Sequence, residues 1–253
     1  MNIRFLCWNV QGCGDIKFLN VARQFLRDTR PDIVGFVEPR VSGRRADVVI
    51  HALGFPHSHR IECIGYSGGI WICWYDIVHV DVLMNHFQYL HCPILHRATN
   101  CSILSTLIYA SPNATKRKYL WPSLLRLAST IVFPWILLGD FNATLSASER
   151  QGNANSTRPC KLFQQFLHDT GLRDLSFHGP PFTWNRVSTY ARLDRVICNS
   201  YWDEALPETL VKHLTRIRSD YQPLLLQVGC FPNNGRHSHF HYFSGWNSHD
   251  DFK

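Results

Sequence analysis

The sequence lacks the segments that place a chain in a membrane or direct it to secretion. No run approaches the ~18 consecutive apolar residues of a membrane span. Arg4 and Trp8-Asn9 interrupt the apolar stretch at the start, which argues against a signal peptide. None of the nine cysteines forms a Cys-x-x-Cys pair, so we expect reduced thiols and neither a disulfide framework nor a zinc site. We therefore expect a soluble intracellular protein, nuclear or cytoplasmic, with no membrane partner.

Dense basic blocks, internal repeats and low-complexity segments are also absent. The formal net charge is +7 with a sequence pI near 9.0, and the positive side chains are scattered. This balance mildly favours a polyanionic partner, and a basic solvated surface explains it equally well. The 253 residues can form one large domain or two small ones. We assign 1–230 to one domain and 231–253, rich in His, Asn, Gly and aromatic residues, to a poorly ordered linker or tail.

Hydrophobic periodicity predicts a mixture of helices and strands. Apolar residues recur at helical spacing in 17–28, 46–53, 121–130 and 162–167, and a short helix is expected around Trp202. Strand-like runs occupy 3–8, 33–37, 58–64, 70–74, 78–83, 88–91, 101–109, 135–139, 182–184, 193–198, 211–214 and 224–228. The middle of the chain therefore contains hairpins, with helices on either side. Two sheets packed face to face, with helices outside, would bury all the apolar faces.

The most informative stretch is Leu137-Leu138-Gly139-Asp140-Phe141-Asn142. A short apolar run ends in glycine, and two polar residues then flank a phenylalanine. Because alternate side chains of an extended segment share a face, Asp140 and Asn142 are expected to project together while Phe141 faces the core. A carboxylate and an amide placed in this way can orient a water molecule against phosphorus. A strand end with an Asx turn explains the same residues without any chemistry.

Other polar residues recur at strand ends along the chain: Asn9, Glu38, Tyr109, Asp194 and Asp220. If they converge on one rim of a sandwich, they supply what a phosphodiester and a hard cation need, because carboxylate oxygens hold Mg²⁺ and amide or phenol donors hold phosphoryl oxygens. Each residue also has a structural explanation. Asn9 can form an Asx turn, Glu38 can cap the end of its strand, and Asp220 can cap a helix or a turn. Tyr109 can pack, and Asp194 can pair with Arg192 or Arg195.

Six motifs in this order resemble those of the endonuclease/exonuclease/phosphatase superfamily, which includes DNase I-like enzymes. They are Trp8-Asn9-Val10-Gln11-Gly12, Glu38, Tyr109-Ala110-Ser111-Pro112, Gly139-Asp140-Phe141-Asn142, Arg192-Leu193-Asp194-Arg195 and Ser219-Asp220-x-x-Pro223. Each motif is weak alone, and the resemblance covers about residues 3–228. It implies an α+β fold: a four-layer α/β/β/α sandwich of two mixed β-sheets flanked by helices.

Finer details resemble the endonuclease domain of plant LINE-type, non-LTR retrotransposon polyproteins. They are Gly179-Pro180-Pro181-Phe182-Thr183-Trp184, the run 192–195, Trp202, and the closing Phe240-His241-Tyr242-Phe243 with Trp246 and Phe252. In such polyproteins a reverse transcriptase follows, so we expect a truncated or isolated open reading frame derived from an element. The resemblance implies a metal-dependent DNA endonuclease that nicks its substrate. It would act as a monomer, with DNA as partner and no small organic cofactor.

The resemblance also implies roles for individual residues. Glu38 would ligate Mg²⁺, or alternatively Mn²⁺, with Asn9 and either Asp194 or Asp220 nearby. Asp140 would orient or deprotonate the attacking water, while Asn142 and Tyr109 would hold the scissile phosphate. Asp220 would support the residue that follows it.

That following residue departs from the family pattern, because Tyr221 stands where the family has a phosphate-contacting histidine. A tyrosine phenol, with a reference pKa of ~10, stays neutral at physiological pH and offers one O–H group. Loss of a general acid–base or electrostatic group typically lowers the rate ~10²–10⁴-fold. We therefore expect reduced or absent nuclease activity. The alternatives are an inactive nucleic-acid-binding descendant and a phosphatase of small molecules with the same fold.

Overall fold

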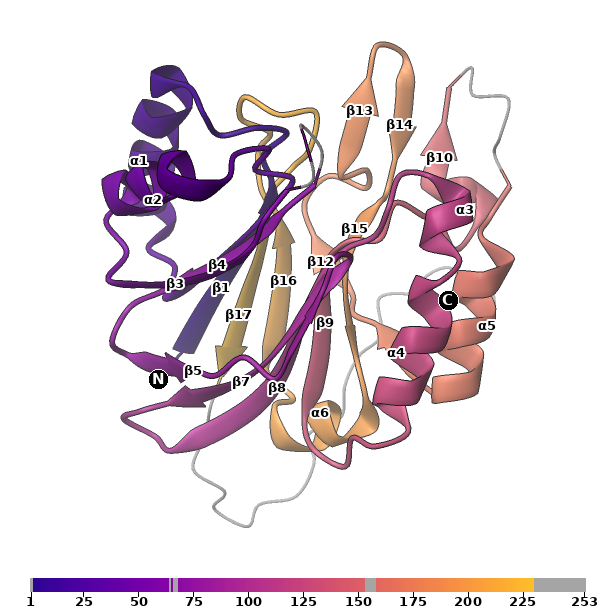
Figure 1. The fold of residues 1–253 in the computed structure, drawn as a ribbon. Helices are drawn as coiled ribbons and strands as arrows, with labels where there is room; N and C mark the ends of the chain where they lie inside the picture. The colour runs from indigo at the N-terminus through magenta and orange to yellow at the C-terminus, as the bar shows by residue number, and fades with distance from the viewer. Residues whose placement is uncertain (1, 64, 66–67, 153–157, 230–253) are drawn as a thin grey trace, which may run out of the picture.

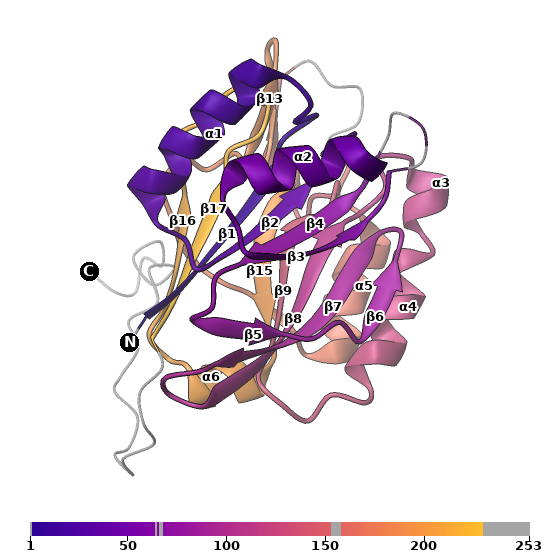
Figure 2. The same cartoon turned by 60° about the vertical axis from the view of Figure 1, so that its left-hand side comes forward.

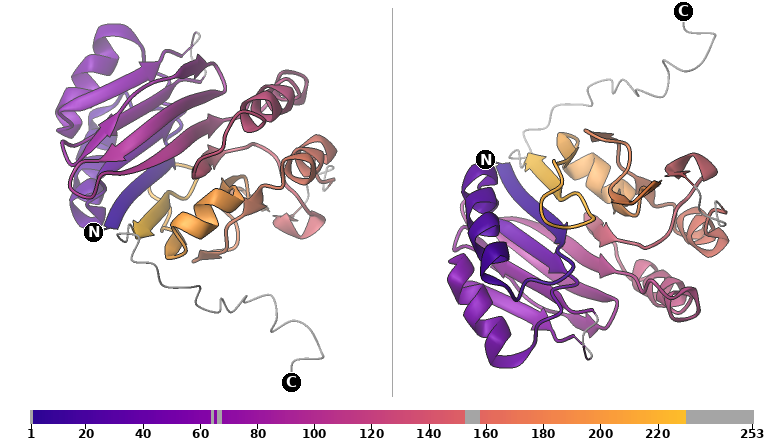
Figure 3. Two further views of the ribbon diagram at one scale, coloured as in Figure 1. Left: turned by 90° about the horizontal axis from the view of Figure 1, so that it is seen from below. Right: turned by 90° about the horizontal axis from the view of Figure 1, so that it is seen from above.

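Two β-sheets pack face to face, and helices cover the outer side of each (Figures 1 and 3). The computed structural model describes residues 2–63, 65, 68–152 and 158–229. The predicted tail 231–253, with the motif residues that it contains, lies outside this part. No helix of the described residues is long and apolar enough to cross a membrane.

The first sheet contains both ends of the described chain. Its seven strands follow one another in space as β12 (Phe177–His178), β16 (Thr209–His213), β17 (Leu224–Gly229), β1 (Asn2–Asn9), β2 (Ile33–Val37), β4 (Ile70–Trp74) and β3 (His57–Ile61). At its centre β1 pairs in parallel with β2 and antiparallel with β17. The first and last described strands are therefore neighbours, which brings the two terminal sequence motifs together.

The second sheet is built from the middle of the chain. Its strands are β11 (Arg173–Asp174), β15 (Asp194–Cys198), β9 (Trp135–Asp140), β8 (Cys101–Tyr109), β7 (Tyr89–His96) and β5 (Val78–Val80), with β6 (Met84–His86) also paired to β7. A separate three-stranded sheet consists of β10 (Arg150–Gln151), β14 (Thr189–Ala191) and β13 (Trp184–Arg186). In Figure 1 the β13–β14 hairpin stands above the end of β15.

The helices lie outside the two sheets. Helices α1 (Ile16–Thr29) and α2 (Gly43–Leu53) cross the outer face of the first sheet (Figure 2). Helices α4 (Leu120–Ala128) and α5 (Lys161–Thr170) cover the second sheet, and α3 (Ala114–Arg117), η1 (Ala147–Glu149) and α6 (Ser200–Ala205) are short. The order of layers is therefore helix, sheet, sheet, helix, as the sequence predicts.

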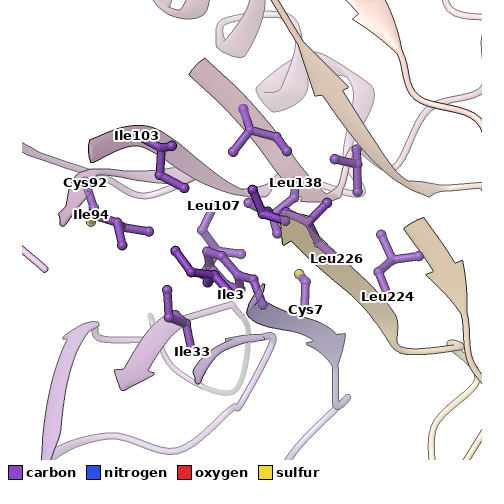
Figure 4. Close-up of a cluster of buried hydrophobic side chains, with 14 of the residues drawn as sticks. Ile3, Cys7, Ile33, Cys92, Ile94, Ile103, Leu107, Leu138, Leu224 and Leu226 are labelled. Carbon is purple, nitrogen blue, oxygen red and sulfur yellow. The ribbon is translucent and has the colours of Figure 1, made fainter. Parts of the chain in front are cut away.

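Strand alternation explains why three cores form. In β1, Ile3 and Cys7 point between the sheets, where they meet Leu107 and Leu138 of the second sheet (Figure 4). Trp8 is on the opposite face of β1 and packs against α1 and α2. The second sheet has a matching outer core with α4 and α5. The central strands, such as β2 and β9, thus bury both faces, which accounts for the long apolar runs in the sequence.

The α+β sandwich is confirmed, and most predicted elements are present with shifted ends. The prediction was wrong in three places. The strand at 78–83 ends at Val80, the strand at 88–91 extends to His96, and 182–184 contributes only Trp184 to a strand. The shortest strands, of two or three residues, carry too few positions to show a period, so β6, β10, β11, β12 and β14 were not predicted.

Candidate active site

The core between the sheets ends in polar side chains at one edge. In β1, Ile3, Phe5 and Cys7 occupy alternate positions that face this core, and Asn9 is next in the same row. Strand β15 is antiparallel to β9, so its first residue lies at the edge where β9 ends. The residues that complete such rows are Asn9, Tyr109, Asp140 and Asp194. The alternation that builds the core therefore also gathers the candidate site.

Asp140 is fully buried at the centre of this group. Its Oδ2 accepts a hydrogen bond from Asn9 Nδ2 at 2.9 Å, across the space between the two sheets. Its Oδ1 accepts from the backbone N–H of Asn142 at 2.8 Å. Burial raises the pKa of the Asp140 carboxyl, and hydrogen bonds from Asn142, Asn9 and Tyr221 partly oppose the rise. A carboxylate with a raised pKa is a better proton acceptor, which suits a group that activates water.

Asn142 reaches Asp140 by a different route from the one predicted. Strand β9 ends at Asp140, and Asn142 has a left-handed backbone with φ of 47°. Its side chain nevertheless turns back, and Nδ2 donates to Asp140 Oδ2 at 3.0 Å and to Ala110 O at 2.8 Å. Both N–H groups of the amide are thus engaged within the protein. Asn142 therefore holds Asp140 in place, and in this arrangement it has no N–H left for a phosphate.

Asp194 lies directly opposite Asp140 in the β9–β15 pair and is also buried. Thr183 Oγ1 accepts hydrogen bonds from the backbone N–H groups of Leu193 and Asp194, at 3.0 and 2.9 Å. Asp194 Oδ2 makes no hydrogen bond within the described part of the chain. Burial and the neighbouring Asp140 both raise the pKa of Asp194. Two buried carboxyls thus stand side by side with one oxygen unsatisfied.

The structure does not place Asp194 in an ion pair with the arginines that flank it in sequence. Arg192 and Arg195 instead bind Asp174 and Glu149, with N–O distances of 2.6 to 3.2 Å. This network ties β15 to β11 and to the loop that follows the site. Arg195 is completely buried within it. An ion pair with Arg192 or Arg195 therefore does not explain the position of Asp194.

Glu38 follows β2 with a left-handed backbone, φ 58°, and lies at the same edge. Arg40 donates to its Oε1 through both Nε, at 3.0 Å, and a terminal nitrogen. The Tyr109 phenol lies near both Glu38 and Asp140. Burial raises its pKa first, and these two carboxylates raise it further. Tyr109 is therefore a neutral hydrogen-bond donor next to Glu38.

Tyr221 is enclosed by the β13–β14 hairpin and β15. Its side chain is 6% exposed and packs with Trp184, Ala191 and Leu193. The phenol lies among the carboxylates of the site and hydrogen-bonds to Asp140. Burial, followed by the charge of Asp140, raises its pKa. Tyr221 thus reaches the site, but only as a neutral O–H group.

The residues before Tyr221 fasten the end of β1. Ser219 Oγ donates to the backbone oxygen of Asn9 at 2.7 Å, and the Asp220 backbone N–H donates to Gln11 Oε1 at 2.8 Å. The Asp220 carboxylate is partly exposed and accepts from Gln11 Nε2 at 3.5 Å. Asn9 also forms the Asx turn considered above, because its Oδ1 accepts from the Gln11 N–H at 3.2 Å.

Three contributors were not singled out from the sequence: Gln11, Thr183 and Arg40. Gln11 and Thr183 belong to the motifs at 8–12 and 179–184, so their neighbours gave a signal. Their hydrogen bonds join residues that are far apart in the chain; Gln11 and Asp220, for example, are separated by 209 positions. Arg40 lies two residues after Glu38. Both residues have left-handed backbones, and this turn, which the sequence does not predict, brings the Arg40 side chain back onto Glu38.

The oxygen donors at this edge fit a hard divalent cation. The described residues contain no group of three or more His, Cys, Asp and Glu side chains arranged to hold a metal. The available donors are instead the Glu38 carboxylate and the Asn9 amide oxygen, beside the unsatisfied Oδ2 of Asp194. Carboxylate and amide oxygens suit Mg²⁺, which usually retains several waters and takes few protein ligands.

Comparison with solved structures finds the same fold in several nucleases. An apurinic/apyrimidinic (AP) endonuclease from Leishmania major has a TM-score of 0.68 and 15% identity, covering 91% of this chain and 88% of that chain. A 3′–5′ exonuclease from Neisseria meningitidis has a TM-score of 0.63 and 17% identity, covering 88% and 98%. The endonuclease domain of TRAS1, a telomere-specific non-LTR retrotransposon, has a TM-score of 0.63 and 16% identity, covering 90% and 98%.

At these identities the structural likeness establishes the fold alone. No curated protein sequence matches the chain significantly. The model of the Endonuclease/Exonuclease/phosphatase family matches residues 6–221, which include every candidate site residue from Asn9 to Tyr221. The chain therefore belongs to the Endonuclease/Exonuclease/phosphatase family.

Proposed function

We propose that the chain is a divalent-metal-dependent phosphodiesterase that nicks DNA, and that Tyr221 makes it a slow one. One observation carries this proposal. Asn9, Tyr109, Asp140 and Asp194 come from four strands of two sheets and meet at one edge, where Asn9 and Asp140 are joined by a 2.9 Å hydrogen bond. Burial of carboxyl groups without an ion-pair partner lowers the stability of a fold, so their convergence at one edge favours a catalytic role.

The residues of this edge divide the chemistry among them. Asp140, held by Asn9 and Asn142, takes the proton of the attacking water. The neutral phenols of Tyr109 and Tyr221 turn their O–H groups from Glu38 and Asp140 to the phosphoryl oxygens as negative charge develops there. A divalent cation held by Glu38 and Asn9 would stabilise the same charge and the leaving oxygen. No imidazole is present among these side chains to protonate the leaving group or stabilise its charge.

DNA and a retroelement origin are the finer parts of the proposal. The likeness to the TRAS1 endonuclease domain and to a Neisseria 3′ phosphatase bound to a DNA hairpin supports DNA as the substrate. The run 179–184 provides the Thr183 that holds the Leu193-Asp194 backbone, which gives this retroelement-like motif a structural function. A plant LINE-type source, with Mg²⁺ preferred over Mn²⁺ and a monomeric state, remains a prediction from the motifs.

Nicking of supercoiled plasmid DNA tests the proposal directly. We expect slow conversion to open circles with Mg²⁺, none with EDTA, and a ~10²–10⁴-fold loss for Asp140→Asn. Glu38→Gln should require a higher Mg²⁺ concentration, because one donor loses its charge. Asp28→Asn, at the far end of α1, is the matched control and should nick like the unaltered protein. Equal nicking by Asp140→Asn and the unaltered protein would show that this edge is not the active site.

The second candidate is a DNA-binding protein that no longer cuts, and Tyr221 is the observation in its favour. It predicts salt-dependent DNA binding with no nicking in either Mg²⁺ or Mn²⁺. A plasmid assay extended to long incubation, with the Asp140→Asn variant as background, separates slow cutting from none.

A further inference from the structure

A pocket lined by four arginines opens beside the candidate active site. It has a volume of about 610 Å³, and its lining includes Arg40, Arg186, Arg216, Arg218, Gln11 and Asp220. These residues come from separate parts of the chain: the loops after β1 and β2, the β13–β14 hairpin and the loop before β17. Because no single segment is basic, the sequence shows only scattered arginines. The fold brings them to one place.

The positive charge of this pocket is only partly neutralised. Arg40 pairs with Glu38, and Arg218 lies 3.5 Å from the exposed Asp15. Arg216 donates to the neutral Asn185. The side chain of Arg186 makes no hydrogen bond or ion pair with the residues that the structure describes. Several guanidinium groups around one cavity repel one another, and an anion in the cavity relieves this repulsion.

The pocket and the active site share a wall. Gln11 lines the pocket and accepts from the Asp220 N–H, while Ser219 donates to the backbone oxygen of Asn9. Asn9 in turn binds Asp140. Arg40 lines the pocket and holds Glu38. A ligand that extends from Asp140 along this wall therefore enters the pocket.

We propose that this pocket binds a second phosphodiester of the nucleic-acid strand, next to the one presented to Asp140. Guanidinium groups match phosphate oxygens in fork geometry, and an open polar cavity suits a strand that passes through it. The pocket thereby selects polynucleotide strands over phosphate esters of small molecules. This inference rests on the proposed function, since it assigns the neighbouring site to a phosphodiester.

Equilibrium binding separates the pocket from general charge attraction. The probe is a short fluorescein-labelled DNA duplex, followed by anisotropy in EDTA so that no cleavage occurs. The double variant Arg186→Ala/Arg218→Ala removes two positive charges from the pocket. Of these two side chains, only Arg218 has an ion-pair partner among the described residues, the exposed Asp15 at 3.5 Å. Arg97→Ala/Arg126→Ala removes two exposed charges, one on the turn before β8 and one on α4, remote from the strand ends that form the site.

We expect the pocket variant to lose at least about tenfold in affinity, and its salt dependence, the slope of log K against log salt, to fall by about 2. The control pair should change both much less. Equal losses in the two variants would refute the pocket. So would a pocket variant that binds the duplex as tightly as the unaltered protein.

Failure of the pocket and failure of the proposed function give different results. If the pocket variant binds less tightly and no protein ever nicks plasmid DNA, the pocket stands and the enzymatic proposal falls. If the Asp140-dependent nicking is present and both arginine pairs bind alike, the enzyme stands and the pocket falls.

Discussion

Tyr221→His is the substitution that most directly tests the chemistry of the site. In the folded chain the Tyr221 phenol touches Asp140 and has a raised pKa, so it stays neutral at any pH near 7. An imidazole in this position would have two carboxyls as neighbours, Asp140 and Asp194. Opposite charges favour the imidazolium form, and the unpartnered Oδ2 of Asp194 is available to accept its N–H.

The expected gain is large compared with the structural cost. An added acid or cationic group that acts in the transition state is worth ~10²–10⁴ in rate, or about 2.7–5.5 kcal/mol. Against this, the smaller ring leaves a gap beside Trp184, Ala191 and Leu193 and lowers the free energy of unfolding by about 1–3 kcal/mol. The variant should therefore fold at room temperature and nick much faster than the unaltered protein.

The assay is Mg²⁺-dependent nicking of supercoiled plasmid, at a temperature below the unfolding transition of every variant. Tyr221→Phe is the matched control, because it keeps the aromatic ring and removes only the O–H group. We expect Phe to nick no faster than Tyr, and the gain of His to disappear in Tyr221→His/Asp140→Asn. If the unaltered protein already nicks as fast as Tyr221→His, Tyr221 does not impair the site and the reasoning is wrong.

Three further substitutions test how the fold holds this site. Asp194→Asn should raise the free energy of unfolding by about 1–3 kcal/mol at pH 7. A carboxyl whose pKa is raised by folding binds its proton more tightly in the folded chain, so its contribution to stability falls as pH rises above the unfolded pKa. The gain should vanish at pH 4, and a less stable variant at pH 7 in urea unfolding would contradict it. Gly139→Ala places a Cβ 2.1 Å from Ile108 O at φ 134° and should cost at least about 3 kcal/mol, whereas Gly171→Ala, with open space around its Cβ, should cost about 1 kcal/mol. Similar melting temperatures for these two variants would argue against the close strand approach. Glu149→Gln should cost about 3 kcal/mol because it leaves Arg195 buried with half of its ion pairs, while Asp47→Asn in the exposed pair with Arg60 should leave the urea midpoint unchanged.

The sequence predicted the fold because its long elements carry strong periods. Strands such as β4 and β8 match their predicted ranges at both ends, since turn residues or a change of pattern mark each boundary. The same alternation put Asn9 and Asp140 at strand ends, and the resemblance to known motifs put them at a common edge. Hydrophobic periodicity does not predict the direction that the chain takes after a strand ends. Asn142 and Glu38 adopt left-handed backbones, and their contacts follow from that geometry.

Ion pairs between residues far apart in the chain are the other feature that a single sequence does not predict. The Arg192–Arg195 motif predicts charge next to Asp194, but the partners Glu149 and Asp174 are 18 to 46 residues away and no pattern connects them. The arginine pocket is hidden for the same reason, because its members come from four segments. Periodicity therefore locates strands and their ends. It does not say which charged side chains the folded loops bring together.

The pair of buried carboxyls gives the strongest physical argument that this edge still interacts with a cation. Asp140 and Asp194 lie opposite each other on adjacent strands, both with raised pKa values, and one Asp194 oxygen has no partner among the described residues. The position that would carry a cationic imidazole holds the neutral Tyr221, so the protein itself supplies little compensating charge there. Two buried acids without an ion-pair partner among the described residues lower the stability of the fold, and Asp194→Asn would relieve part of this cost. Proteins keep such arrangements where function requires them. The metal ion proposed above is the partner whose charge suits this edge, and Mg²⁺-dependent stabilisation of the unaltered protein that is lost in Glu38→Gln would identify it.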